Sequence, residues 1–183
     1  MNVKDIVLAA AQSLGIKTGV SAYFDSGDTA CEREAELLLS CFNLVESGLA
    51  LDYLPLYAED TLRSANGKVE FSSFAYSPVR ILDVTDSKGN AVAYTLYAKY
   101  LKAQSGTLKI TYTYTPNKKG IDEESDFDLL TGDHVFVYGV LAEYCLAENM
   151  FEEAAAWDKK FKDSIEVIFH TRKCQRLSSR RWV

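Results

Sequence analysis

Side chains suited to acid–base catalysis are sparse in this chain of 183 residues, which contains only two histidines. His134 comes at the start of a strongly apolar segment, where packing or capping is a more frequent role than proton transfer. His170 comes where a helical pattern gives way to a basic tail. The sequence has no GxSxG nucleophile elbow, no Walker or GxGxxG phosphate loop and no HExxH zinc motif. We therefore predict a protein that is not an enzyme, with no catalytic residues and no cofactor.

Carboxylates form two groups that would suit paired acid–base catalysis or metal binding. One is Asp52 with Asp60, and the other lies in the polar segment 116–132: Asp122, Glu123, Glu124, Asp126 and Asp128. A helix–loop–helix calcium loop needs Asp or Asn at alternate positions, glycine at the sixth and glutamate at the twelfth, which this segment lacks. We predict a solvated connection at 116–132 and no metal site. A small-molecule binder or enzyme with this loop near its site stays as an alternative.

The four cysteines, Cys31, Cys41, Cys145 and Cys174, are all more than four residues apart. This spacing excludes a zinc knuckle and a redox CxxC pair. Cys31, Cys41 and Cys145 fall in helical apolar patterns, where a small buried hydrophobic side chain is the expected role. Cys174 belongs to the tail and has no predicted partner.

Charge is distributed unevenly along the chain. The formal net charge is −6, yet residues 171–183 carry five basic residues and no acid, so residues 1–170 carry −11. An acidic body with a basic arm suggests a binding partner for the arm. It argues against tight nucleic-acid binding by the body, because phosphate binding needs clustered cations. The alternative is a basic tail that only keeps the protein soluble.

The first half of the chain predicts helices. Residues 1–15 read as a short amphipathic helix ending near Gly15, and Asp5 interrupts the apolar run that a signal peptide would need. A loop is expected at 18–25. A long helix follows near 28–47, capped by Asp28 or Thr29 and apolar on one face. No stretch approaches the ~20 uncharged apolar residues of a membrane span.

The middle of the chain predicts strands. Residues 49–63 form a bridge that Pro55 keeps from being helical. Strands are expected from about 68 to 114, with a hairpin of 78–84 and 92–97 around a turn at 86–90. The clearest strand is 107–114, whose alternate residues Leu108, Ile110, Tyr112 and Tyr114 share one face. Such a small antiparallel meander needs helices to cover it.

Two apolar helices close the chain. Residues 135–147 contain one charged side chain, Glu143, which predicts burial on nearly all sides, and Gly139 would let another helix approach closely. The next helix carries one apolar stripe: Met150, Ala154, Trp157, Phe161, Ile165 and Ile168. The fold class is therefore α+β: the helix near 28–47 and a helical hairpin at 133–170 packed with a meander at about 68–114. We expect a single domain over 1–170 and a basic C-terminal arm at 171–183.

Tyrosines recur in the predicted sheet, at Tyr94, Tyr97, Tyr100, Tyr112 and Tyr114. Aromatic side chains interleaved with lysines can stack nucleic-acid bases. The acidic body makes half-buried packing the preferred interpretation. Tyrosines on a partly exposed face also suit subunit interfaces.

Four segments follow one another in a distinctive order: DYLPLYAEDTL (52–62), KVEFSSFAYSPVRILDVTDSKGN (68–90), LKITYTYTP (108–116) and VYGVLAEYCLAENMFEEAAAWDKKF (137–161). This order resembles that of the head-to-tail connector (neck adaptor) proteins of tailed phages. The resemblance covers roughly residues 30–175, and its motifs are structural, with no single diagnostic residue.

The resemblance implies a structural virion protein, made in the host bacterial cytoplasm and located in the neck between head and tail. Such adaptors form a ring, typically of twelve copies, that contacts the portal and the tail proteins while viral DNA passes through without specific binding. The residues that would dock into the portal or a neighbouring subunit are those of the arm: Arg172, Lys173, Arg176, Arg180, Arg181 and Trp182. A tail-completion or tube-terminator protein of the virion is the alternative within the same class.

Overall fold

A computed structural model describes residues 1–127 and 132–172, with side chains up to residue 169. The predicted α+β class is correct. The single domain expected over 1–170 is replaced by two compact units. We call residues 1–45 and 119–172 the helical unit and residues 46–118 the sheet unit.

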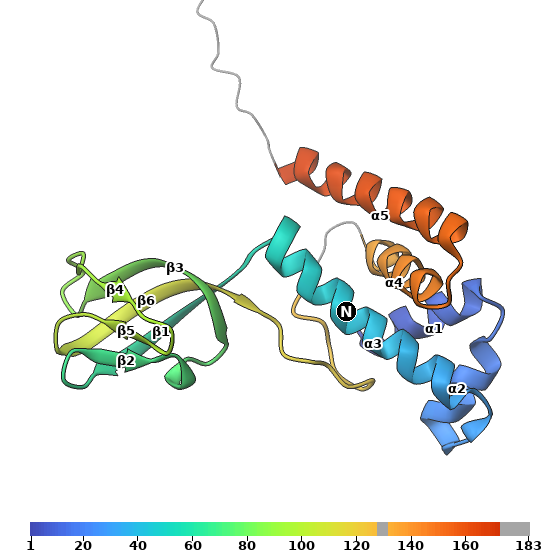
Figure 1. The fold of residues 1–183 in the computed structure, drawn as a ribbon, viewed down its shortest axis with the longest axis horizontal. Coiled ribbons are helices and arrows are strands. Elements are labelled where there is room, and N and C mark those ends of the chain that lie inside the picture. The colour runs from blue at the N-terminus through green and yellow to red at the C-terminus, as the bar shows by residue number, and fades with distance from the viewer. Residues whose placement is uncertain (128–131, 173–183) are drawn as a thin grey trace, which may run out of the picture. The chain divides into compact units, whose positions relative to one another are not determined.

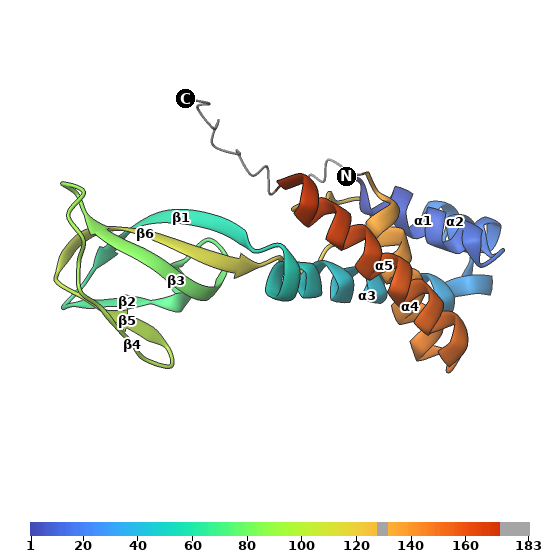
Figure 2. The ribbon, with the colours of Figure 1, turned by 90° about the horizontal axis from the view of Figure 1, so that it is seen from above.

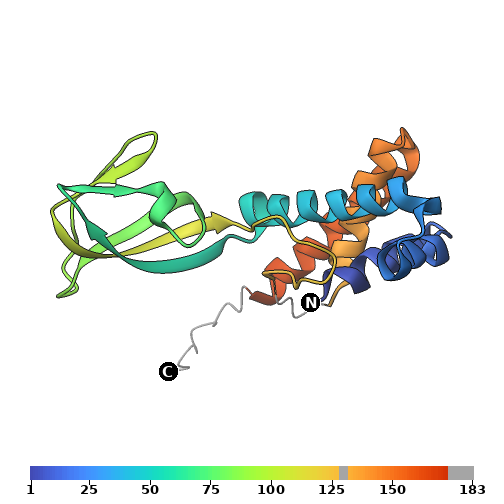
Figure 3. The ribbon, with the colours of Figure 1, turned by 90° about the horizontal axis from the view of Figure 1, so that it is seen from below.

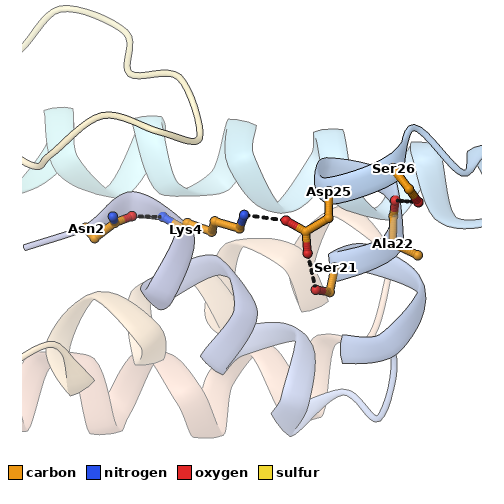
Figure 4. Close-up of polar contacts among 6 residues, drawn as sticks. All are labelled: Asn2, Lys4, Ser21, Ala22, Asp25 and Ser26. Atoms are coloured by element: carbon orange, nitrogen blue, oxygen red, sulfur yellow. Dashed lines mark hydrogen bonds and ion pairs between the residues drawn. The ribbon is translucent and has the colours of Figure 1, made fainter.

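The helical unit begins with two short helices, α1 (Val3–Ser13) and α2 (Lys17–Ser26). Asn2 caps α1 by accepting the Lys4 N–H at 2.8 Å, as Figure 4 shows. The Lys4 ammonium pairs with Asp25 of α2 at 2.5 Å, and Ser21 donates to the same carboxylate at 2.8 Å. The loop predicted at 18–25 is therefore wrong, because contacts with α1 compensate for the weak helix formers in this segment.

The long helix α3 (Glu32–Gly48) follows a single 3₁₀ turn at Thr29–Cys31. Asp28 caps that turn by accepting the Ala30 N–H at 3.0 Å, which confirms the predicted start. The apolar face of α3 is buried as its spacing predicts, at Ala35, Leu38, Cys41, Phe42 and Val45. Figures 1 and 2 show α3 crossing α4 in the helical unit.

Helices α4 (His134–Ala147) and α5 (Phe151–Arg172) form the predicted hairpin. Asn149 adopts a positive φ of 62° in the turn between them. A Cβ atom on Gly139 would lie 2.7 Å from Val45 Cγ1 and 3.0 Å from Phe161 Cε2. The absence of a side chain at Gly139 therefore lets α3 and α5 pack on α4, as predicted.

Aromatic rings link the parts of the helical core. Phe42 of α3 stacks on Phe136 of α4 with ring centroids 5.5 Å apart, and Phe127 packs on Phe136 at 5.9 Å. Val3, Ile6, Val7 and other buried side chains of α1 complete the core. This core combines segments from both ends of the sequence.

The sheet unit contains two three-stranded antiparallel sheets (Figure 3). The first has the order β1 (Leu56–Ser64), β6 (Gly106–Thr115), β3 (Ser77–Asp86). The second has the order β2 (Lys68–Glu70), β5 (Tyr100–Lys102), β4 (Thr95–Leu96). Strand β1 falls in the segment predicted as a bridge, and β5 was not predicted.

The strands do not form the predicted meander. The hairpin after β3 begins as expected, with the Val92 N–H donating to the Val84 carbonyl at 2.8 Å. The chain then leaves β3, and β4 pairs with β5. Strand β3 instead pairs with β6, which lies between β1 and β3.

The sheet unit has a hydrophobic core of its own. Its buried side chains come from both sheets: Val69, Phe74, Ile81, Val84, Leu101, Leu108, Ile110 and Tyr112. The expectation that helices must cover the sheet is corrected, because the second small sheet supplies Val69 and Leu101 to this core. The predicted alternation of strand 107–114 is confirmed, since Leu108, Ile110 and Tyr112 are fully buried.

Candidate functional site

The predicted docking arm lies outside the described residues. Arg172 is the last residue of α5, and its side chain is not described. Lys173, Arg176, Arg180, Arg181 and Trp182 belong to the segment after it, as does Cys174. Asp128 and the side chain of His170 also lie outside the described part of the chain.

The carboxylates considered for catalysis have different surroundings. Asp60 accepts the Tyr112 hydroxyl at 2.7 Å and the Ala75 N–H at 2.9 Å, so it links β1 to β6 and to the turn before β3. Asp52 is exposed in the π-helical turn Leu49–Tyr53. Burial, with the Asp60 hydrogen bond as a second cause, raises the pKa of Tyr112 to about 12. These contacts give Asp60 a structural role in the sheet unit.

Two acids of segment 116–132, Glu123 and Asp126, form contacts within the helical unit. Lys119 pairs with Asp126 at 2.5 Å, and the Lys119 N–H donates to Asn43 Oδ1 of α3 at 2.6 Å. Glu123 accepts the Gly120 N–H at 2.8 Å, and its own carbonyl accepts the Val3 N–H at 3.1 Å. Among residues 1–127 and 132–172, no group of three or more His, Cys, Asp or Glu side chains is placed to hold a metal ion.

The remaining candidate groups pack in the helical unit. Cys41 and Cys145 are buried as predicted, and Cys31 is partly exposed beside Gly19. Burial raises the pKa of the Cys41 thiol to about 12, so this thiol is protonated at neutral pH. His134 is exposed, with its ring against Tyr138 at 5.8 Å between centroids.

The predicted tyrosine group divides into core and surface members. Tyr112 is fully buried, and Tyr114 stacks on Tyr76 with centroids 4.2 Å apart. Tyr97 and Tyr100 stack on each other at 4.7 Å with an interplanar angle of 14°. This second pair lines the surface hollow that is the strongest candidate site in the described chain.

The hollow lies on the outer side of β2 and β5 and has a volume of about 860 Å³. Alternation along each strand explains its lining, because Val69 and Leu101 point into the core and their neighbours point outward. The backbone holds its shape, since the Phe71 N–H donates to the Lys99 carbonyl at 3.1 Å. Its lining is Lys68, Glu70, Phe71, Ser72, Tyr97, Ala98, Lys99 and Tyr100.

Strand register brings like charges together beside the hollow. Lys68 of β2 lies directly opposite Lys102 of β5, and Glu70 lies opposite Tyr100. The Lys68 ammonium sits 4.9 Å from the centre of the Tyr100 ring. Within the described residues none of Lys68, Lys99 and Lys102 forms an ion pair. The arrangement is a basic aromatic surface suited to an anionic group that can also contact tyrosine rings. We call these three lysines with Tyr97 and Tyr100 the lysine–tyrosine face.

Exposed apolar side chains also gather on the sheet unit. Of the twelve large hydrophobic side chains that are exposed in the described chain, eight belong to residues 46–118: Leu51, Tyr57, Tyr76, Val79, Leu82, Tyr94, Leu96 and Tyr97. Two of them, Val79 and Leu82, are the extra residues at register shifts between β3 and β6. Bulges on an edge strand turn side chains away from the regular pattern. The sheet unit therefore presents more exposed apolar surface than the helical unit.

Sequence reasoning found the tyrosines but not the lysine–tyrosine face. No strand was predicted between residues 97 and 107, so the sequence did not predict the pairing of Lys68 with Lys102. The available signal was the sequence Tyr-Leu-Lys at 100–102, which alternates outward, inward and outward.

Comparison with known proteins adds no assignment. No protein-family model matches the chain, and no curated protein matches it. Within the described residues, no helix has both the length and the apolar character needed to cross a membrane.

Proposed function

We propose that this chain is a head-to-tail adaptor of a tailed phage, a structural protein of the virion neck. It assembles with further copies of itself into a ring between portal and tail, through which viral DNA passes. The observation that carries this proposal is the concentration of exposed apolar and aromatic side chains on the sheet unit. Exposed aromatic side chains are enriched in contacts between subunits.

The distribution of charge supports the same function. Residues 1–45 and 119–170 carry 19 acidic and 7 basic residues, a formal charge of −12, while residues 46–118 carry 7 acidic and 8 basic residues, a charge of +1. The acidity of the body thus resides in the helical unit. An acidic surface lets DNA pass with little adhesion, because clustered cations are what hold phosphate groups.

The segments that resemble adaptor proteins fall on defined elements. The segment 52–62 ends in β1, 68–90 covers β2 and β3, and 108–116 covers most of β6. The segment 137–161 covers the α4–α5 hairpin up to the middle of α5. The resemblance therefore extends over both units.

The test is binding to portal rings encoded beside this gene. The full chain should co-sediment with the portal, and electron microscopy of the complex should show a ring of added density on one end of the portal. A chain lacking 171–183 should keep the hydrogen-exchange protection of α4 and α5 and lose portal binding, if the arm is the anchor.

Three results would reject all or part of this proposal. Absence of the chain from purified portal–tail necks would reject the adaptor function. Density at the tail-tube end only would favour the tail-completion alternative. Full portal binding by the truncated chain would leave the adaptor function standing and reject the arm as its anchor.

The hollow favours a second candidate, a small-molecule binder. Its volume of about 860 Å³ and its aromatic lining fall within the range of ligand sites. A screen for ligands that quench tyrosine fluorescence would test it, with Tyr97→Ala as the variant that should abolish the signal.

A further inference from the structure

Two lysines of the lysine–tyrosine face lie opposite each other, and no ion pair within the sheet unit offsets the repulsion between their charges. Lys68 and Lys102 are directly opposite on neighbouring antiparallel strands. Like charges at such positions lie about 5 Å apart at Cβ and destabilise the pairing. No carboxylate of the described residues pairs with either lysine, and the one acid in the hollow, Glu70, lies opposite Tyr100. An anionic partner at this face would offset the repulsion between the two lysines.

The aromatic part of the face favours a protein surface over a single small anion. Tyr97 is 44% exposed although it stacks on Tyr100. Exposed tyrosine is enriched at protein interfaces, and charged side chains such as these lysines belong to the polar rim of an interface. A nucleic-acid groove would need a longer track of cations than three lysines, in a unit whose net charge is only +1.

The same chain offers a complementary acidic surface. Glu32, Glu36 and Glu148 line a shallow hollow of about 560 Å³ on the helical unit, with Leu37 and Ala147 between them. Arg33 lies there too, and its charge is balanced by Glu148. The hollow thus presents an excess of carboxylates around apolar side chains, in a unit whose residues 1–45 and 119–170 carry a formal charge of −12.

We propose that the lysine–tyrosine face of one copy binds the Glu32/Glu36 surface of a second copy. This contact joins two different surfaces, and such head-to-tail contacts close into rings when the rotation between copies permits. The inference rests on the proposed adaptor function for its biological setting, and it adds which surfaces join neighbouring copies. Lys68 and Lys102 supply the charge, and Tyr97 supplies apolar contact area.

Isotope-mixed cross-linking tests the contact directly. A mixture of unlabelled and ¹⁵N-labelled full chains is treated with a carbodiimide, which joins lysine amines to carboxylates without a spacer. Mass spectrometry should find cross-links from Lys68 or Lys102 to Glu32 or Glu36 in which one peptide is light and the other heavy. Absence of such mixed pairs, with cross-links found only within single chains, would overturn the proposal.

Charge reversal provides the matched control. The variant Lys68→Glu/Lys102→Glu should weaken self-association at low ionic strength by at least about tenfold, because it places like charges against the acidic surface. The variant Lys88→Glu/Lys118→Glu changes the net charge equally at exposed positions outside the face and should associate as the wild type does. Equal loss in both variants would show that only net charge matters and would overturn the proposal.

A compensating variant separates a direct contact from unfolding. The variant Glu32→Lys/Glu36→Lys should also associate weakly by itself. Mixing it with Lys68→Glu/Lys102→Glu should restore association, because the reversed surfaces are again complementary. Failure of the mixture to associate, with hydrogen-exchange protection of both variants intact, would overturn the proposal.

Three further outcomes distinguish the proposed contact between copies from the proposed adaptor function. Binding of a single-stranded oligonucleotide that is lost in Lys68→Glu/Lys102→Glu, without mixed cross-links, would replace the second copy with nucleic acid. Mixed cross-links in a chain that does not bind the portal would preserve this contact and reject the adaptor function. Portal rings decorated normally by Lys68→Glu/Lys102→Glu would preserve the adaptor function and reject this contact.

Discussion

The helical unit and the sheet unit differ in how their hydrophobic cores are built from the sequence. The helical unit is discontinuous in sequence, and its core joins α1 and α3 to the α4–α5 hairpin across the whole of residues 46–118. The sheet unit is continuous, and its core is made by two small sheets from the same segment. The helical unit carries the acidic charge, whereas the sheet unit carries most of the exposed apolar side chains.

This difference shows how one chain holds two separate hydrophobic cores. A continuous segment with its own core can be inserted between two helices without breaking the core of the host unit. The inserted unit can then expose apolar and aromatic side chains at its surface. If the units are energetically independent, a core change in one should leave the other folded.

The largest expected effects are those of core truncations in each unit. Phe42→Ala should lower the stability of the helical unit by about 3–5 kcal/mol, because it removes the ring that stacks on Phe136. Leu108→Ala should lower the stability of the sheet unit by about 2–5 kcal/mol. Hydrogen exchange resolved by peptide should show each loss in its own unit. Loss of protection in both units from either change would contradict their independence.

Filling the space at Gly139 should have a smaller effect. Gly139→Ala should destabilise the helical unit by about 1–3 kcal/mol, because its Cβ would meet Val45 and Phe161. The helix propensity of alanine offsets only about 1 kcal/mol of that loss. Gly48→Ala is the control, since a Cβ there meets no atom within 4 Å and the melting temperature should not fall. An equal fall for the two variants would contradict the close approach of the helices.

Removing the Tyr112 hydroxyl should affect the sheet unit alone. Tyr112→Phe loses the hydrogen bond to Asp60 and should cost about 1–2 kcal/mol in urea unfolding. The folded-state pKa of Tyr112 is raised from 10.0 to about 12, so its contribution is complete below about pH 10 and is lost as pH rises through 12. Tyr112→Phe should therefore show a shallower fall in sheet-unit stability between pH 10 and 12. An unchanged alkaline slope would contradict this assignment.

The smallest effect is expected at the ion pair between α1 and α2. The hydrogen bond and charge of Lys4 lower the pKa of Asp25, so the pair adds stability above the ordinary aspartate pKa of 3.8 and loses it as pH falls below that value. Both side chains are solvent-accessible, which limits the gain. Lys4→Met should lower the melting temperature of the helical unit only slightly at pH 7 and not at all at pH 2. A change confined to low pH would contradict the sign of this linkage.

Elements with strong periodicity were predictable, and elements that depend on partners were not. The stripes of α3 and α5 and the alternation of β6 identified these elements from sequence. Strand β1 was not predicted because Asp60 interrupts the apolar positions Ala58 and Leu62 on its inward face. The Asp60 carboxylate is tolerated there because it accepts hydrogen bonds from Tyr112 and Ala75. Helix α2 was not predicted because it is stabilised by packing and by the ion pair of Asp25 with Lys4 of α1, which its own sequence does not reveal.

The candidate site was foreseen only in part. The predicted tyrosine group was assigned to packing or to an interface; Tyr112 is packed in the sheet core, whereas Tyr97 of the candidate site is exposed and stacks on Tyr100. Two of its lysines, Lys68 and Lys102, are more than thirty positions apart in the sequence, and only the pairing of β2 with β5 makes them neighbours.

The sequence by itself determined the α+β class, the apolar helices of the hairpin and the separation of charge between the body and the arm. It also determined that another helix can approach closely at Gly139. These follow from local patterns, because side-chain period and composition are properties of a single segment. Only the tertiary structure decided that the chain has two units, that the sheet covers itself, and that β6 lies between β1 and β3. Those outcomes depend on which distant segments pair, and many pairings would satisfy the same local periodicity.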